Sequence, residues 1–512
     1  MSQIKHFIKK SAMTPKDLEV ESKEYGWFDL NIIKQLAEGC IPNILYFALV
    51  NLGMVFNLYF ISSANNDETL IASIGVGNTW IEATCYTLIA SVNCGLNTLI
   101  SQAYGAKDYN LVAKYFQRGL LINSVVLLSI SVLSVLSADF FNLFGYDKDL
   151  SASTGKYIIY MMPEMAAYVL FDTLKTYAQG HTVFAVPMYI HAGCGIFEIF
   201  TSYYFIKMSD WGLLGYAISR GICELNKCII LIWYIRKNEA FKETFIPFES
   251  DFYIGTVKQV WFQVHCGAVI YIEMLAYYVE VFFAATLGKQ MTALTINNSI
   301  MVFVWGSTCG INYAISTFVS KAMGEKDIAL AKGYLKNCIT GGNILILLIS
   351  LVILAWVRQW GQLFTDDKEI LWWVSTLLII YSLTSFMDNI QNIFSATLRS
   401  VGKERVATLI FILSFYLIGF PIGLVLGFPV GLGVIGLILG SRIAMTISVY
   451  LFGKILLVLD WKHQAYLVTE RMAEDNNLEV KKDITSSLKD IEMHLLPGSP
   501  RSPRSPTGTW HR

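Results

Sequence analysis

The sequence is poor in charged residues. Asp, Glu, Lys and Arg make up 15% of its 512 residues, whereas a soluble domain carries roughly 25%. Basic and acidic residues balance at 39 each, so no basic surface argues for a nucleic-acid partner. Because 54% of the residues are hydrophobic, we expect an all-α polytopic membrane protein that is surrounded by the lipid bilayer.

Motifs for enzyme chemistry and for processing are also missing. The sequence has no GxSxG, HExxH or Walker loop, which argues against an enzyme. Its nine cysteines form no CxxC pair, so we interpret them as buried packing residues and expect no metal or cofactor. Residues 1–30 lack the apolar core of a signal peptide, and we expect them to form a cytoplasmic segment.

The sequence does contain an internal repeat. SQAYGAKD at Ser101–Asp108 returns as SKAMGEKD at Ser320–Asp327, and eight of eighteen residues around each copy are identical at an offset of 219. Such self-similarity indicates a duplicated structural unit. Each copy lies where a long apolar run ends in a short charged loop, so we expect two similar halves.

Apolar runs predict twelve transmembrane helices, because a bilayer core about 30 Å thick needs roughly 20 apolar residues per helix. Six belong to an N-terminal lobe, residues 31–237, and six to a C-terminal lobe, residues 258–458, with residues 238–257 as the linker. The predicted spans lie near 31–60, 71–98, 116–144, 157–180, 183–207, 212–235, 258–287, 292–318, 335–357, 370–397, 406–428 and 432–458.

Lys and Arg predict the orientation of these spans. Fifteen lie in loops on one side of the membrane and six on the other, which places both termini in the cytoplasm. Six spans separate the two repeat copies, so both copies lie on the same side. The lobes are then parallel repeats, related by an axis along the membrane normal, with a cleft between them.

After residue 458 the sequence becomes polar, and we expect residues 459–512 to form a disordered cytoplasmic tail. The tail ends in Ser-Pro steps at Ser499, Ser502 and Ser505, with interleaved arginines. Such a composition cannot build a packed core. It indicates either a phosphorylation or trafficking segment, or a solvated tail without a role.

Acidic residues inside the predicted helices are the first candidates for function, because a charge in the membrane is costly. Glu273, Tyr277 and Glu280 lie on one face of the seventh span, since they are four and seven residues apart. Asp388 lies in the middle of the tenth span. A carboxylate that is desolvated between helices can take up a proton near neutral pH, which suits exchange of a proton for a cationic solute.

Three further residues complete the predicted substrate cavity. Asp172 lies in the fourth span, the repeat partner of the tenth, and Glu82 lies in the second. Trp305 offers an aromatic face for a cation-π contact.

Other charged residues of the spans have a structural interpretation. Arg220 and Glu224 are four residues apart and are predicted to pair with one another, with Lys227 close enough to join them. The sequence does not assign a role to Glu198 or Arg442.

Several stretches resemble one family. LNTLISQAYGAKDYNLVAKYFQRGLLI resembles the end of the second span in eukaryotic multidrug and toxic compound extrusion (MATE) transporters, and IEMLAYYV resembles their seventh span. TLKTYAQGHTVFAVP is similar to the loop after their fourth span, and ATLRSVGKERVATLIFILSFYLIGFPIGLVLGFPVGLGVIGLILG to their tenth to twelfth spans. The resemblance implies a secondary antiporter with two six-helix lobes, which exports organic cations or other small organic compounds against H⁺ or Na⁺.

The resemblance also implies site residues. The acid of the seventh span corresponds to Glu273 and that of the tenth to Asp388, which makes these two the expected coupling residues. Other family acids are replaced here, by Tyr278, Ser299 and Asn97.

Two alternatives and a cellular setting remain as expectations. Coupling to Na⁺ is the rival within the family, and a lipid-linked precursor flippase is the rival in the wider superfamily, although it needs a basic cleft. We expect a monomer in the plasma membrane or in a vacuolar or endolysosomal membrane.

Overall fold

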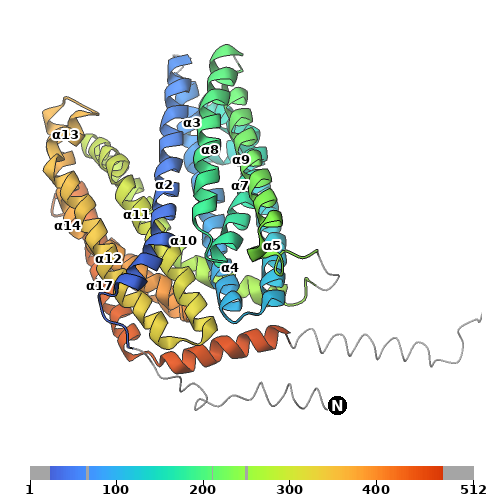
Figure 1. The fold of residues 1–512 in the computed structure, drawn as a ribbon. Coiled ribbons are helices and arrows are strands. Elements are labelled where there is room, and N and C mark those ends of the chain that lie inside the picture. Colours follow the sequence, from blue (N-terminus) through green and yellow to red (C-terminus); the bar gives the residue numbers. More distant parts are fainter. Residues whose placement is uncertain (1–23, 65–67, 210, 248–251, 477–512) are drawn as a thin grey trace, which may run out of the picture.

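The computed structural model describes residues 24–64, 68–209, 211–247 and 252–476, and these residues form helices and connecting loops without a strand. The helices form two lobes, which spread apart toward the top of Figure 1 and meet near its base. The N-lobe contains α2 (Leu30–Ala64), α3 (Glu68–Ile81), η2 (Glu82–Tyr86), α4 (Thr87–Gly105), α5 (Tyr109–Val135), α6 (Ser137–Leu143), α7 (Lys148–Gly180), α8 (Ala185–Ser202), η3 (Tyr203–Met208) and α9 (Gly212–Lys237).

The C-lobe follows a linker that contains the short helix η4 (Glu239–Phe241). It contains α10 (Thr256–Ala284), η5 (Ala285–Leu287), α11 (Lys289–Glu325), α12 (Ile328–Ala355), α13 (Val357–Gln362), α14 (Lys368–Ser400), α15 (Glu404–Phe411), η6 (Ile412–Gly419), α16 (Phe420–Gly427) and α17 (Val434–Val458).

Eight of these helical segments are long and apolar enough to cross a membrane. They are Ala72–Gly105, Tyr109–Val135, Thr256–Leu287, Lys289–Glu325, Ile328–Ala355, Lys368–Ser400, Glu404–Gly427 and Val434–Val458. The other predicted spans coincide with α2, α7, α8 with η3, and α9. Of these, α7 and α9 carry buried charged residues, which lower their hydropathy.

The two copies of the repeat have the same local structure. Lys107 and Lys326 both adopt left-handed backbone angles, with φ of 59° and 63°. The next residue caps the following helix in each case: Asp108 accepts a hydrogen bond from the Leu111 amide, and Asp327 accepts one from the Leu330 amide. The capping aspartates explain why α5 and α12 begin seven residues before the predicted spans at 116 and 335.

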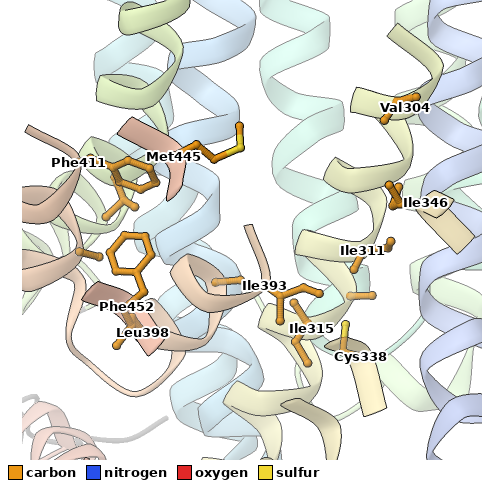
Figure 2. Close-up of a cluster of buried hydrophobic side chains, with 14 of the residues drawn as sticks. Val304, Ile311, Ile315, Cys338, Ile346, Ile393, Leu398, Phe411, Met445 and Phe452 are labelled. Carbon is orange, nitrogen blue, oxygen red and sulfur yellow. The ribbon is translucent and has the colours of Figure 1, made fainter. Parts of the chain in front are cut away.

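A large apolar cluster holds the C-lobe together. Figure 2 shows Phe411, Met445 and Phe452 on one side of the cluster, and Ile311, Ile315 and other α11 side chains on the opposite side. Between apolar helices in lipid, close contact and dispersion stabilise such packing.

Small residues allow the two lobes to approach closely. A Cβ atom at Gly95 of α4 would lie 2.7 Å from the Gln263 Cα of α10, and one at Gly310 of α11 would lie 2.7 Å from the Ile44 amide nitrogen of α2. Only glycine leaves room for these two crossings.

The prediction that the chain is disordered from residue 459 onward is wrong for residues 461–476, which form a C-terminal helix. Trp461 and Ala465 are buried in the apolar core of the C-lobe, whereas Val468 and Met472 are buried in that of the N-lobe. This helix, red in Figure 1, lies across the base of both lobes. The predicted Ser-Pro segment lies outside the described residues.

Candidate functional site

The C-lobe contains a cavity of about 250 Å³. Glu273, Tyr277 and Glu280 reach it from α10, so the face predicted from their spacing lines a cavity. Asp388 reaches the same cavity from α14 and Trp305 from α11. We call it the C-lobe cavity; it is also lined by Met274, Val281, Leu294, Asn298, Met301, Val302, Val304, Tyr381, Ser385, Asn392 and Arg442.

Glu273 is held by a short hydrogen-bond chain. Gln391 Nε2 of α14 donates to Glu273 Oε1 at 2.5 Å, and Ser448 Oγ of α17 donates to Gln391 Oε1 at 2.5 Å. Glu273 is only 4% exposed, so this amide replaces water as the partner of the carboxylate. These two hydrogen bonds fix one carboxylate oxygen of Glu273, while Glu273 still lines the cavity.

Asp388 is less constrained than Glu273. Within the described part of the chain, its carboxylate has no hydrogen bond or ion pair, and the Asp388 peptide oxygen accepts from Asn392 Nδ2 at 3.1 Å. The carboxylate is half-buried and faces the C-lobe cavity. Asp388 can therefore bind a proton or a cation without first losing a partner.

Arg442 supplies the positive charge of the C-lobe cavity. Its guanidinium carbon lies 4.3 Å from the centre of the Tyr381 ring, a cation-π contact. Its neighbour Ser441 donates a hydrogen bond to Glu280 Oε2. The lining thus contains three acids, Glu273, Glu280 and Asp388, and one described base.

A second cavity, of about 460 Å³, lies mainly in the N-lobe. We call it the N-lobe cavity; it is lined by Tyr46, Phe47, Leu49, Val50, Gly53, Asn78, Thr79, Glu82, Tyr86, Ala90, Tyr168, Asp172, Lys175, His191, Gly195, Glu198, Arg220, Glu224 and Lys227, and from the C-lobe by Tyr278, Val302, Trp305 and Tyr313. Of the predicted cavity residues, Glu82, Asp172 and Trp305 line this space. The predicted set therefore falls into two groups, and Trp305 belongs to both.

Asp172 is fully engaged by its neighbours. Asn93 Nδ2 donates to Asp172 Oδ2 at 2.7 Å, and the Lys175 ammonium donates to Oδ1. Asn123 Nδ2 in turn donates to Asn93 Oδ1 at 2.7 Å. A buried acid with these partners is balanced in charge, which sets Asp172 apart from Asp388.

The predicted pairing of Arg220 with Glu224 is wrong. Arg220 instead donates to Glu164 of α7 at 2.9 Å and lies 3.9 Å from Glu198 of α8. Glu224 pairs with Lys227 at 2.5 Å. Glu164 is fully buried, and a buried carboxylate without a cation would cost several kcal/mol. The packing of α7 on α9 thus decides the pairing.

Sequence reasoning missed Gln391, Tyr381 and Glu164, and it left Arg442 without a role. Gln391 follows Asp388 by three residues, so the two share a face of α14. This spacing could have identified Gln391 from the sequence as a neighbour of Asp388. Tyr381 and Glu164 gave no comparable signal, because their partners lie on other helices.

Two helical lobes with an internal repeat and polar cavities between long apolar helices are typical of membrane transporters. Residues 42–204 and 267–425 match the MatE family model. The chain belongs to this family, the multidrug and toxic compound extrusion transporters, as the resemblance implied. It is therefore a multi-pass membrane transporter of small compounds and not an enzyme.

Curated relatives and solved structures agree with this assignment. Protein DETOXIFICATION 18 of Arabidopsis thaliana is 25% identical over 376 residues, which cover 72% of this chain and 80% of that protein. An uncharacterized transporter of Schizosaccharomyces pombe is 24% identical over 452 residues, 88% of this chain and 83% of that protein. The crystal structure of the eukaryotic MATE transporter AtDTX14 has a TM-score of 0.80 at 18% identity, and covers 86% of this chain and 99% of that one.

Proposed function

We propose that the protein is a proton-coupled antiporter that exports small organic cations by alternating access, with Glu273 and Asp388 as the coupling acids. The observation that carries this proposal is that both acids line one small membrane cavity in which acids outnumber bases. Placing two charges in low dielectric is costly, and a proton or a cation relieves that cost. Protonation from one side of the membrane then promotes release of the cation there.

Twelve spans with both termini in the cytoplasm complete the proposal. Eight helical segments meet the length and hydropathy of a span. Among the other four, α7 and α9 bury their charges as ion pairs, including Lys175 with Asp172 and Arg220 with Glu164, and paired charges are tolerated inside a helical bundle. The excess of Lys and Arg on the side of the repeat loops supports the orientation.

The conformation supports a cycle of alternating access. The lobes meet at the end that carries the repeat loops and diverge toward the other end. With the repeat loops in the cytoplasm, this arrangement corresponds to a state that is closed to the cytoplasm. Export then requires a second state in which the repeat loops separate.

A lipid-linked precursor flippase receives less support than an exporter of organic cations. Such a substrate carries phosphates, which need a basic cavity. In both cavities the described acids outnumber the described bases. Sodium stays the rival coupling ion, because carboxylates also bind Na⁺.

Transport by the purified protein in proteoliposomes tests the proposal. Uptake of ethidium and of radiolabelled tetraethylammonium is measured with a pH gradient alone, with a Na⁺ gradient alone, and with neither. We expect accumulation driven by the pH gradient. Accumulation driven by the Na⁺ gradient alone would show that Na⁺ and not H⁺ is the coupling ion. Absence of transport of both cations under every gradient would contradict cation export.

A further inference from the structure

The C-terminal helix, residues 461–476, is fixed to the C-lobe at its beginning. It follows α17 with only Leu459 and Asp460 between them. Trp461 and Ala465 are buried in the apolar core of the C-lobe, and the Lys332 ammonium of α12 lies 5.8 Å from the centre of the Trp461 ring. These contacts lie within one lobe, so a movement of the two lobes against each other leaves them unchanged.

The second half of the same helix also binds the N-lobe. Val468 and Met472 are buried in the apolar core of the N-lobe. Hydrogen bonds join this part of the helix to α4, to the repeat loop after α4 and to α5: Arg471 donates to Gln102, Asn476 Nδ2 donates to Asp108 Oδ2 at 2.7 Å, and the Tyr115 hydroxyl donates to Asp475 Oδ2 at 2.7 Å. The helix thus crosses from one lobe to the other.

The end of the helix keeps contacts with the C-lobe as well. Lys258 of α10 donates to Glu474 Oε2 at 2.7 Å and lies 3.1 Å from Asp475 Oδ1. The Arg471 guanidinium carbon lies 4.3 Å from the centre of the Phe262 ring, also of α10. A separation of the lobes at this end therefore breaks the N-lobe contacts of the helix and leaves its C-lobe contacts in place.

The attachment to the N-lobe is weaker than a fully packed helix interface. A cavity of about 670 Å³ lies between the C-terminal helix and the two repeat loops. Thr469, Met472 and Asn476 line it from the helix, and Lys107 and Lys326 line it from the loops. Surfaces on opposite sides of a cavity lack dispersion contacts with one another. The helix can therefore leave the N-lobe at a lower cost than a helix that is packed along its whole face.

The N-lobe contacts of the helix lie where the two lobes meet. Gln102 accepts a hydrogen bond from Arg471, and its Nε2 donates to the Ser400 carbonyl of α14 at 2.8 Å. Gln102 is fully buried, and a buried amide that loses its partners is costly. One N-lobe side chain thus binds the C-lobe and the C-terminal helix together, and both hydrogen bonds are complete only while the lobes are in contact here.

We propose that the C-terminal helix is a latch: it stays on the C-lobe throughout the transport cycle and leaves the N-lobe each time the repeat loops separate. The strength of its N-lobe contacts then sets the ratio between the closed state of Figure 1 and the state with separated loops. The inference rests on the alternating access proposed above, and it is independent of the substrate and of the coupling ion.

Alkylation of a buried cysteine measures this ratio without a substrate or an ion gradient. Thr317 of α11 is fully buried and accepts a hydrogen bond at 2.9 Å from Asn97 Nδ2 of α4, across the contact between the lobes. In the purified full-length protein without its native cysteines, Thr317→Cys should react with a fluorescent maleimide only while the lobes are apart. Its labelling rate is then proportional to the share of the separated state.

Tyr115→Phe weakens the latch, because it removes the hydroxyl that binds Asp475 and keeps the ring. We expect it to raise the labelling rate of Thr317→Cys about tenfold, which corresponds to about 1.4 kcal/mol. The matched control is Tyr157→Phe, because Tyr157 is also buried and its hydroxyl donates at 2.5 Å to Asn78 within the N-lobe. The control should leave the labelling rate unchanged.

A cross-link tests whether the helix has to leave the N-lobe. Cysteines placed at Lys107 and Asn476, which line the same cavity, are joined by a flexible bismaleimide before Thr317→Cys is labelled. We expect labelling to become at least about tenfold slower. The control cross-link joins cysteines at Lys258 and Glu474, which binds the helix to the C-lobe, and should leave the rate unchanged.

Two results would overturn the latch. One is that Tyr115→Phe leaves the labelling rate at that of the control, which would show that this contact does not hold the lobes together. The other is that the cross-link between positions 107 and 476 leaves the rate unchanged, which would make the helix a fixed strap that stays on both lobes. Transport in proteoliposomes is measured separately, so the latch can fail while the proposed antiport stands, and the reverse.

Discussion

Gly105 packs directly against the carbonyl group of Lys321, and a Cβ atom at Gly105 would overlap that oxygen. Gly324 has the same relation to the carbonyl of Gln102. Gly105 and Gly324 are equivalent positions of the repeat, as are Gln102 and Lys321, at the offset of 219. The two repeat loops therefore form a pseudo-symmetric contact, which closes this end of the molecule only if both glycines stay free of side chains.

The glycine contact gives the first prediction. Gly105→Ala and Gly324→Ala should each separate the repeat loops, because the added methyl group meets backbone atoms that cannot rotate away. The distance between spin labels at Lys107→Cys and Glu325→Cys, in a background without the native cysteines, reports the separation. Gly341→Ala is the control, because no atom lies within 4 Å of its added Cβ. An unchanged distance distribution in both loop variants would contradict the closure.

The C-terminal helix gives the second prediction. Asn476 Nδ2 donates to Asp108 Oδ2 at 2.7 Å, and Lys258 donates to Glu474 Oε2 at 2.7 Å, so the helix binds both lobes. Truncation after residue 460 should lower the thermal unfolding temperature, because it also removes the buried side chains of Val468 and Met472, each worth about 1.5–3 kcal/mol.

Truncation after residue 476 is the matched control for the shorter chain. It keeps the contacts of the C-terminal helix, so the unfolding temperature should equal that of the full chain. Equal unfolding temperatures for both truncations would show that the helix does not stabilise the closed end.

His181, which follows α7, gives a prediction for acid pH. Its Nδ1 donates to the Tyr177 carbonyl at 2.9 Å, and Nε2 lies 2.9 Å from Thr244 Oγ1 of the linker. Burial lowers the pKa of His181 to about 4. Because the unfolded-state pKa is about 6.5, this contact contributes its full stability above pH 6.5 and loses it as the pH falls toward 4, by about 3 kcal/mol.

Hydrogen exchange measures that loss. Amides of residues 238–245 should exchange faster at pH 4.5 than at pH 7, after correction for the intrinsic exchange rate, and His181→Gln should abolish the difference. A corrected ratio of the rates at the two pH values that is the same in wild type and variant would show that another group is responsible.

The orientation gives a fourth prediction. Lys107→Cys lies at the end with the repeat loops and Asp366→Cys at the opposite end, and both positions are exposed. In intact cells, a membrane-impermeant maleimide should label Asp366→Cys but not Lys107→Cys. The reverse pattern would invert the topology and, with it, the direction assigned to export.

The sequence predicted those features that depend on local patterns. The repeat at Ser101 and Ser320 identified two equivalent helix ends, and the spacing of Glu273, Tyr277 and Glu280 identified a face that lines a cavity. Both signals arise within one helix and its following loop. Such signals need no knowledge of how the helices pack.

Contacts between helices could not be predicted from patterns within one helix. Arg220 has a possible partner four residues away, yet Glu164 on α7 takes it because Glu164 is buried and needs a cation. The C-terminal helix was missed for a different reason. Its buried residues, Trp461, Ala465, Val468 and Met472, follow a helical period that the polar composition of the segment concealed.

Transport by charge-neutral variants tests the central claim, that Glu273 and Asp388 couple export to protons. Glu273→Gln and Asp388→Asn keep the shape of each side chain and mimic its protonated form, so both should fold and insert as the wild type does. At matched amounts in proteoliposomes, accumulation of tetraethylammonium under a pH gradient should fall at least about tenfold in each variant, a loss of about 1.4 kcal/mol. Accumulation that stays at the wild-type level in both variants would show that these two acids are structural and that protons couple elsewhere.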